Sequence, residues 1–142
     1  MNKYLILIIV GLVILVAGMG YRYFILPRGQ APVITGNVKA VTIVAKKNQW
    51  RFLPDQITVI RGDKIVATVV NEDDYDHGLA IDAYGVSQRM PANSTITIEF
   101  TVTQEGDFSF YCSVPCGEGV VDGKKRTHFD MVGVIHVVPA SS

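Results

Sequence analysis

The first 26 residues constrain the fold of this chain most, because they carry a long and almost unbroken apolar run. Residues 4–21 provide 18 uncharged positions, and the run resumes after Arg22 as far as Leu26. A helix needs about 20 residues to cross the hydrocarbon layer of a membrane, and in lipid a helix satisfies its own backbone hydrogen-bonding groups. The sequence therefore predicts one N-terminal transmembrane helix, with Arg22 close enough to one end to reach the interface.

A cleaved signal peptide is the alternative interpretation of this run. The apolar part of a signal peptide spans about 7–15 residues and is followed by a small-residue cleavage site. The run here is longer, and neither a clear Ala-x-Ala site nor a cysteine for lipid attachment follows it. We therefore expect an uncleaved anchor at residues 1–28, a linker containing glycine and proline at 29–37, and a single domain at 38–142.

Residues 38–142 show the pattern of short strands and turns that is typical of a β-protein. Short stretches rich in Val, Ile, Thr and Phe alternate with turn signals such as Pro54-Asp55 and Glu105-Gly106. The expected strands are 38–45, 50–52, 56–60, 64–70, 78–81, 95–102, 107–111 and 132–138. Turn signals about 8–12 residues apart predict an all-β sandwich or barrel.

A set of soft metal-ligand candidates lies in the second half of the chain. Its only two cysteines, Cys112 and Cys116, are four residues apart, and His128 and Met131 follow them. His77 lies 35 residues before the first cysteine. Thiolate, imidazole and thioether groups together suit copper and not magnesium or calcium. A disulfide between the two cysteines is the alternative in an exported domain.

Several ordered segments between Trp50 and Val138 resemble the cupredoxin domain of cytochrome c oxidase subunit II, in its compact single-helix type. The matching segments are Trp50-x-Phe52-x-Pro54-x-x-Ile57-x-Val59-x-x-Gly62-Asp63, Asp76-His77-Gly78-Leu79, Gly106-Asp107-Phe108-Ser109-Phe110-Tyr111-Cys112, Cys112-x3-Cys116-Gly117 and His128-x-x-Met131-x-Gly133-x-Ile135. The resemblance covers nearly the whole soluble domain. It implies a cupredoxin-like Greek-key β-sandwich or barrel that carries the binuclear copper centre CuA.

The same resemblance implies which residues hold the copper. The implied ligands are His77, Cys112, the backbone carbonyl of Val114, Cys116, His128 and Met131. The two cysteine sulfurs would bridge two coppers, and one histidine would cap each copper. The thioether and the carbonyl would be weak ligands. Pro115 restricts the preceding residue to an extended backbone, which favours a loop whose carbonyls point inward.

The chain departs from the family pattern between the second cysteine and the second histidine. The family has three residues there, whereas eleven lie between Cys116 and His128. The surplus falls within residues 120–127, where Asp122-Gly123 is a strong signal for a two-residue hairpin. A hairpin returns to its starting point, so Gly119 and His128 can lie close together, which keeps the ligand geometry possible. If His128 is not a ligand, a single copper with Glu118 or Asp130 nearby is the alternative.

The resemblance also implies function and location. It implies an electron-transfer subunit on the outer, periplasmic or extracellular face of the cell membrane, held by a single-pass anchor. Its electrons would come from cytochrome c or a small copper protein and go to subunit I of a haem-copper oxidase, and the chain would not be catalytic alone. Arg22 and Arg28 favour the opposite orientation under the positive-inside rule. The alternatives are a stand-alone module for copper binding or delivery and the CuA subunit of a nitric oxide reductase.

The remaining charged residues give weaker indications. The 13 basic and 13 acidic residues balance, which does not indicate binding of nucleic acid. Acidic residues cluster around His77, and either a solvated loop or a docking patch for a basic cytochrome c fits them. This cluster consists of Glu72, Asp73, Asp74, Asp76 and Asp82. His136 matches no ligand position, and we expect it to be structural or to face the surface.

Overall fold

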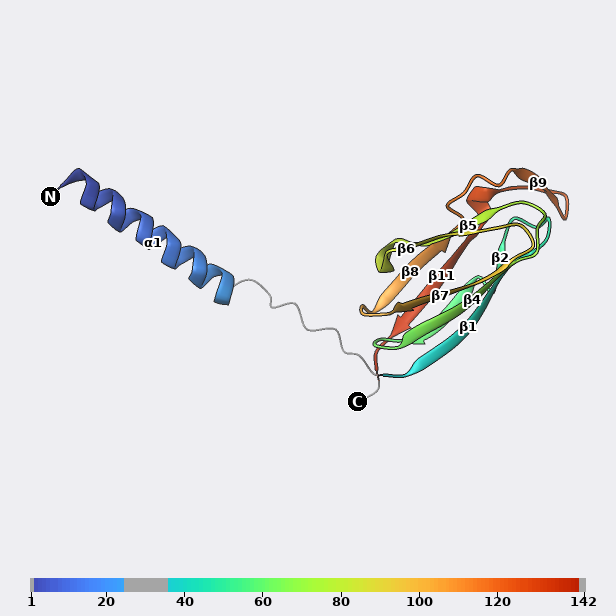
Figure 1. The fold of residues 1–142 in the computed structure, drawn as a ribbon, viewed down its shortest axis with the longest axis horizontal. Coiled ribbons are helices and arrows are strands. Elements are labelled where there is room, and N and C mark those ends of the chain that lie inside the picture. The colour runs from blue at the N-terminus through green and yellow to red at the C-terminus, as the bar shows by residue number, and fades with distance from the viewer. Residues whose placement is uncertain (1, 25–35, 141–142) are drawn as a thin grey trace. The chain divides into compact units, whose positions relative to one another are not determined.

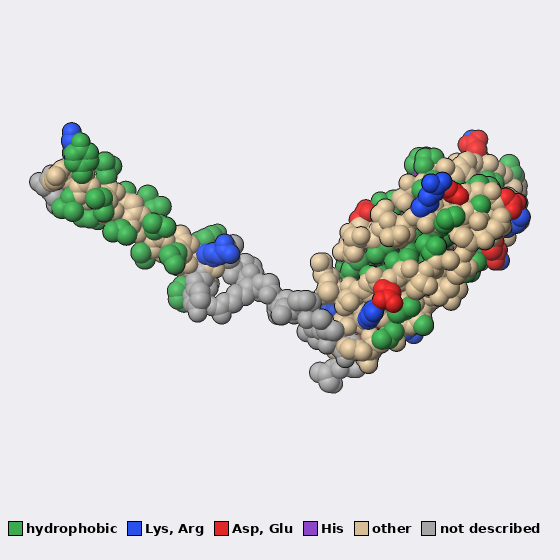
Figure 2. All heavy atoms as spheres, viewed as in Figure 1, with side chains coloured by type: hydrophobic (Ala, Val, Ile, Leu, Met, Phe, Trp, Pro, Cys, Tyr) green, Lys and Arg blue, Asp and Glu red, His purple; other side chains and the backbone are tan. Residues whose placement is uncertain are grey.

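The N-terminal part of the chain forms a single apolar helix. The computed structural model describes residues 2–24 and 36–140, and the chain divides into two compact units, 1–31 and 32–142. Helix α1 (Lys3–Phe24) exposes its apolar side chains along its length (Figures 1 and 2). Its segment Lys3–Arg22 is long and apolar enough to cross a membrane. The predicted helix is therefore confirmed, whereas most of the predicted linker at 29–37 lies outside the described residues.

The second unit consists of short strands, as predicted. The described strands are β1 (Val38–Ala45), β2 (Phe52–Leu53), β3 (Gln56–Ile60), β4 (Lys64–Asn71), β5 (His77–Ile81), β6 (Val86–Met90), β7 (Thr95–Thr101), β8 (Gly106–Tyr111), β9 (Glu118–Val121), β10 (Lys124–Thr127) and β11 (Val132–Val138). Two short 3-10 helices, η1 (Asp82–Tyr84) and η2 (His128–Asp130), interrupt them. Every predicted stretch overlaps a strand, and β1, β3 and β11 have the predicted bounds.

The strands form two main sheets and one separate hairpin. The first sheet has the order β2-β1-β4-β7, and the second has the order β3-β11-β8-β5-β6. β1 pairs with β4, and β11 with β3, in parallel, whereas the remaining pairs are antiparallel. The described chain is thus mostly β-sheet with one N-terminal apolar helix, as the sequence predicted.

Alternating side chains from the two sheets make one core. Every second residue of β4, from Ile65 to Asn71, is buried, and β3 and β11 alternate in the same way. The rings of Phe52 in the first sheet and Phe110 in the second lie 5.7 Å apart between their centroids. Such alternation is expected for sheets that bury one face. His77 and Met131 are also fully buried, so the candidate ligands extend this core.

The surplus residues between the second cysteine and the second histidine form the predicted hairpin. β9 and β10 pair antiparallel from Val121 opposite Lys124 to Glu118 opposite Thr127. Asp122 and Gly123 make the turn with positive φ values of 50° and 73°, as a type I′ turn requires. Figure 1 shows β9 at the opposite end of the second unit from the start of β1.

Candidate metal centre

Three of the six candidate ligands lie at the ends of strands of the second sheet. His77 is the first residue of β5, Cys112 follows β8 directly, and Met131 precedes β11 directly. The backbone N–H of Cys112 donates to the carbonyl of Met131 at 3.0 Å, which continues the pairing of β8 with β11. Paired strands thus bring together ligands that are far apart in the sequence.

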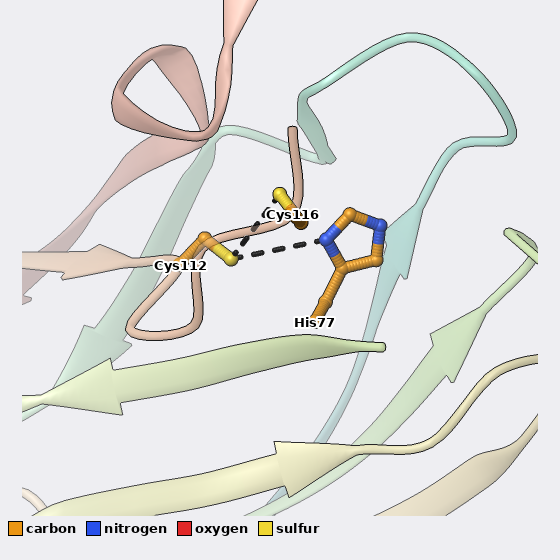
Figure 3. Close-up of side chains that lie close together, drawn as sticks. All are labelled: His77, Cys112 and Cys116. Carbon is orange, nitrogen blue, oxygen red and sulfur yellow. Dashed lines mark hydrogen bonds between the residues drawn. The ribbon is translucent and has the colours of Figure 1, made fainter. Parts of the chain in front are cut away.

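Three of the predicted ligands converge in a buried group. The sulfur of Cys112 lies 3.8 Å from the sulfur of Cys116 and 3.8 Å from Nδ1 of His77. The ligand atoms of the three residues all lie within 4.8 Å of one another, and all three residues are buried. Figure 3 shows the Cys112 sulfur joined by dashed lines to the Cys116 sulfur and to the nearer ring nitrogen of His77. Both cysteines are free and do not form the alternative disulfide.

The two predicted weak ligands adjoin this group. The Met131 sulfur lies 3.6 Å from the Cys116 sulfur and is fully buried. The carbonyl oxygen of Val114 lies 3.1 Å from the Cys112 sulfur. The thioether and the carbonyl are therefore next to different cysteines.

The surroundings of the two sulfurs make them unequal. The Cys116 thiol next to Cys112 lowers the pKa of Cys112, and contacts with His77 and with the backbone N–H of Gly78 lower it further. The same contact and burial raise the pKa of Cys116. Cys112 is thus the first of the pair to become a thiolate, and thiolate is the form that binds metal.

His77 is held at both ring nitrogens. Its Nε2 lies 2.7 Å from Oδ2 of Asp73, and both side chains are fully buried. Burial lowers the pKa of His77, but the contacts with Cys112 and Asp73 outweigh burial, so the net direction is upward. Sequence reasoning missed Asp73, because it grouped this residue with the exposed acids of its loop.

Trp50 closes one side of the group as buried scaffold. Its indole N–H donates to the carbonyl of Cys116 at 3.2 Å. Its ring stacks on Tyr75, which in turn packs against His77 at 5.2 Å between ring centroids. Gly119 has no side chain where it meets the Trp50 ring, and a Cβ there would lie 3.2 Å from Cε3. The indole therefore braces the loop that carries the second cysteine.

His128 is close to the loop but is not part of the three-residue group. The hairpin returns it to the loop, because its backbone N–H donates to the carbonyl of Gly117 at 3.2 Å. Its Nδ1 is buried and has no hydrogen-bond partner among the described residues. Thr127 and Asp130 cap η2, which carries His128. One enclosed imidazole nitrogen therefore has no partner among the described residues, in a residue whose backbone contacts the loop of the second cysteine.

The other four acidic residues of the cluster around His77 have partners of their own. Lys46 pairs with Glu72, Lys47 with Asp74 and Arg89 with Asp76, and the Tyr111 hydroxyl donates to Asp82. The visible face of the second unit in Figure 2 shows both signs of charge interspersed. His136 pairs with Asp107 at 2.7 Å on the sheet surface, in agreement with the structural role expected for it.

Comparison with known proteins identifies the family. A model of the cupredoxin-like domain matches residues 14–121. The minor chloroplastic isoform of plastocyanin from Arabidopsis thaliana is 28% identical, over 63% of this chain. The match spans 59% of the plastocyanin sequence.

Solved structures share the fold at low sequence identity. Reduced auracyanin from Roseiflexus castenholzii matches with a TM-score of 0.58 and 18% identity, over 73% of this chain and 100% of its own. The periplasmic domain of cytochrome oxidase subunit II (CoxB) from Bradyrhizobium japonicum matches with a TM-score of 0.55 and 21% identity, over 70% of this chain and 83% of its own. A chain of a haem-copper terminal oxidase dimer matches with a TM-score of 0.56 and 17% identity, over 96% of this chain and 97% of its own. The family match covers most of the sequence and agrees with the observed fold, so this chain belongs to the cupredoxin-like domain family.

Proposed function

We propose that this chain is a membrane-anchored electron-transfer protein with a binuclear copper centre of the CuA type. The observation that carries this proposal is the approach of two buried cysteine sulfurs to 3.8 Å beside a buried imidazole nitrogen. Copper bound there supplies reversible one-electron exchange. The protein would hold the metal in a rigid and largely dry setting made by strand ends.

The donor set fits two coppers better than one. A blue-copper site uses two histidines, one cysteine and a weak axial ligand. Here a second thiol, Cys116, is buried beside the first, and its sulfur lies close to the sulfurs of Cys112 and Met131. The Nδ1 of His128 is enclosed and has no hydrogen-bond partner in the part of the chain that the structure describes, which supports a second terminal ligand. We therefore propose His77, Cys112, Val114, Cys116, His128 and Met131 as the copper-binding residues.

Copper stoichiometry tests this assignment. Full-length protein in detergent, loaded with copper and freed of excess metal, is expected to hold two coppers per chain. Cys116→Ser removes one bridging sulfur and leaves the remaining donors, so it is expected to hold one copper or none. His136→Ala, which changes a histidine paired with Asp107 on the surface, serves as the matched control and keeps two. One copper per chain in the unaltered protein would contradict the binuclear assignment.

We also propose that the chain passes electrons to a haem-copper oxidase core at the outer face of the membrane. The match to a chain of a haem-copper terminal oxidase dimer supports this, because it covers 96% of the sequence and so takes in part of α1. The donor would be a cytochrome c or a small copper protein. Purification from native membranes is expected to yield this chain with a large haem-containing subunit. A chain that purifies alone would favour the stand-alone copper module.

A further inference from the structure

Asp73 differs from the other acidic residues of its loop because it is completely buried. Its exposed fraction is 0%, and no lysine or arginine pairs with it among the described residues. Its neighbour Asp74 is 67% exposed and pairs with Lys47. Burying a carboxylate is costly unless hydrogen bonds compensate for the lost water. The partners of Asp73 therefore indicate what the buried carboxylate does.

One carboxylate oxygen of Asp73 fixes the orientation of the His77 ring. Oδ2 lies 2.7 Å from Nε2 of His77, while Nδ1 of the same ring faces the Cys112 sulfur. An ionised carboxylate can only accept hydrogen bonds, and a neutral imidazole carries one N–H. The proton therefore stays on Nε2, and the lone pair of Nδ1 points toward the site.

The other carboxylate oxygen contacts the loop that carries Trp50. Oδ1 accepts the backbone N–H of Asn48 at 2.6 Å. Asn48 and Trp50 both have positive φ, so the backbone of their loop is in a costly conformation that its surroundings must hold. Trp50 in turn donates to the carbonyl of Cys116. A single side chain thus connects the histidine with the loop that braces the second cysteine.

Asp73 is itself held firmly. Its backbone N–H donates to Oδ1 of Asn71, and its carbonyl accepts the N–H of Asn93 at 2.9 Å. The Asn71 amide nitrogen donates to the carbonyls of Tyr75, Met90 and Pro91. This buried network leaves the carboxylate little freedom to turn away from His77.

We propose that Asp73 is the positioning residue of the metal centre. It selects the tautomer of His77 that presents Nδ1 to the metal, and its charge raises the donor strength of the ring. This inference rests on the proposed copper site, but the tautomer exists in the metal-free protein and is measured separately.

Asp73→Asn is the decisive substitution, because it keeps the shape and changes the hydrogen bonding. The amide has one oxygen for two donors, the Asn48 N–H and the His77 N–H. If the oxygen stays on Asn48, the amide NH₂ faces Nε2 and moves the ring proton to Nδ1. We expect copper(I) affinity to fall about 10- to 100-fold and the reduction potential to rise. Asp74→Asn, which removes an equal charge one residue away, is expected to change neither.

Nitrogen NMR of the unaltered, metal-free protein tests the tautomer directly. At a pH where the His77 ring is neutral, we expect the proton on Nε2, in slow exchange with water. A proton on Nδ1 would overturn the inference, as would equal copper affinities in Asp73→Asn and Asp74→Asn. Absence of copper binding by the unaltered protein would refute the proposed function, while the tautomer would still decide the role of Asp73.

Discussion

At the scale of single residues, the two histidines near the site differ in how their ring nitrogens are engaged. His77 has Asp73 at one nitrogen and the Cys112 sulfur near the other. His128 has an enclosed Nδ1 without a partner among the described residues. A buried polar atom without a hydrogen bond is costly. A metal ion at Nδ1 would remove that cost, which is why we propose His128 as the second terminal ligand.

Alanine substitutions of His128 and His136 test whether His128 is a copper ligand. His128→Ala is expected to change the visible spectrum of the copper-loaded protein strongly, because one copper loses its terminal nitrogen ligand. His136→Ala removes a histidine that pairs with Asp107 on the sheet surface and is expected to leave the spectrum unchanged. Absorption spectra of the two variants at equal copper loading make the comparison. Identical spectra would show that the second ligand has been assigned to the wrong residue.

Part of the candidate site could be predicted from the sequence, namely the side chains of its ligands, whereas the buried carboxylate beside them could not. The four side chains His77, Cys112, Cys116 and Met131 are brought together as their residue types and family positions implied. Asp73 was not predicted, because a sequence shows five acids around His77 and not which of them is buried. Its burial depends on the Asn71 network and on the loop at Asn48, both of which are tertiary contacts.

At the scale of secondary-structure elements, the inserted hairpin of β9 and β10 brings the chain back to the loop of the second cysteine, where the His128 N–H donates to the Gly117 carbonyl. Deleting 120–126 keeps Thr127, which caps η2 through its hydroxyl, and is expected to leave two coppers per chain. Deleting 120–127 also removes this cap and places Gly119 before η2, at an expected cost of roughly a few tenths of a kcal/mol in stability. Metal analysis and denaturant unfolding of both deletions distinguish these effects. Loss of binuclear copper in the shorter deletion would mean that the hairpin shapes the site.

The pairing of β11 with its neighbours leaves no room for a side chain at Gly133. A Cβ there would meet the Phe110 ring and would lie 2.7 Å from the carbonyl oxygen of Asp55. That carbonyl already accepts the N–H of Val134 and cannot move without loss. Gly133→Ala is therefore expected to destabilise the domain by about 1–3 kcal/mol.

Urea unfolding checks the expectation for Gly133. Ser109→Ala, on the exposed face of β8, is the matched control and is expected to change stability by no more than about 0.5 kcal/mol. A Gly133→Ala protein as stable as the control would show that β8 and β11 have more space than the contacts indicate.

Strands with clear alternation were predictable, whereas one strand was not. β1, β3 and β11 were predicted with the observed bounds because Val, Ile and Thr dominate them. β6 was missed because only its first and last residues, Val86 and Met90, are buried. Three exposed polar positions lie between them, so no period of two appears. Its pairing with β5 and not its own pattern makes it a strand.

At the scale of the whole molecule, we propose that α1 anchors the chain in the membrane and that the strand-built unit binds copper. α1 is long and apolar enough to anchor the chain, and its apolar side chains are exposed along its length. We expect the protein to remain in the membrane fraction without cleavage. Mass spectrometry of that form should find residues 1–26 intact. A mature chain that starts near Gln30 would contradict the anchor.

The central claim is that one electron is shared by two coppers held between Cys112 and Cys116. Electron paramagnetic resonance of the copper-loaded, full-length protein tests this claim most directly. We expect a purple protein whose hyperfine pattern arises from one unpaired electron delocalised equally over two copper nuclei. A hyperfine pattern from a single copper nucleus, with one copper per chain, would contradict it.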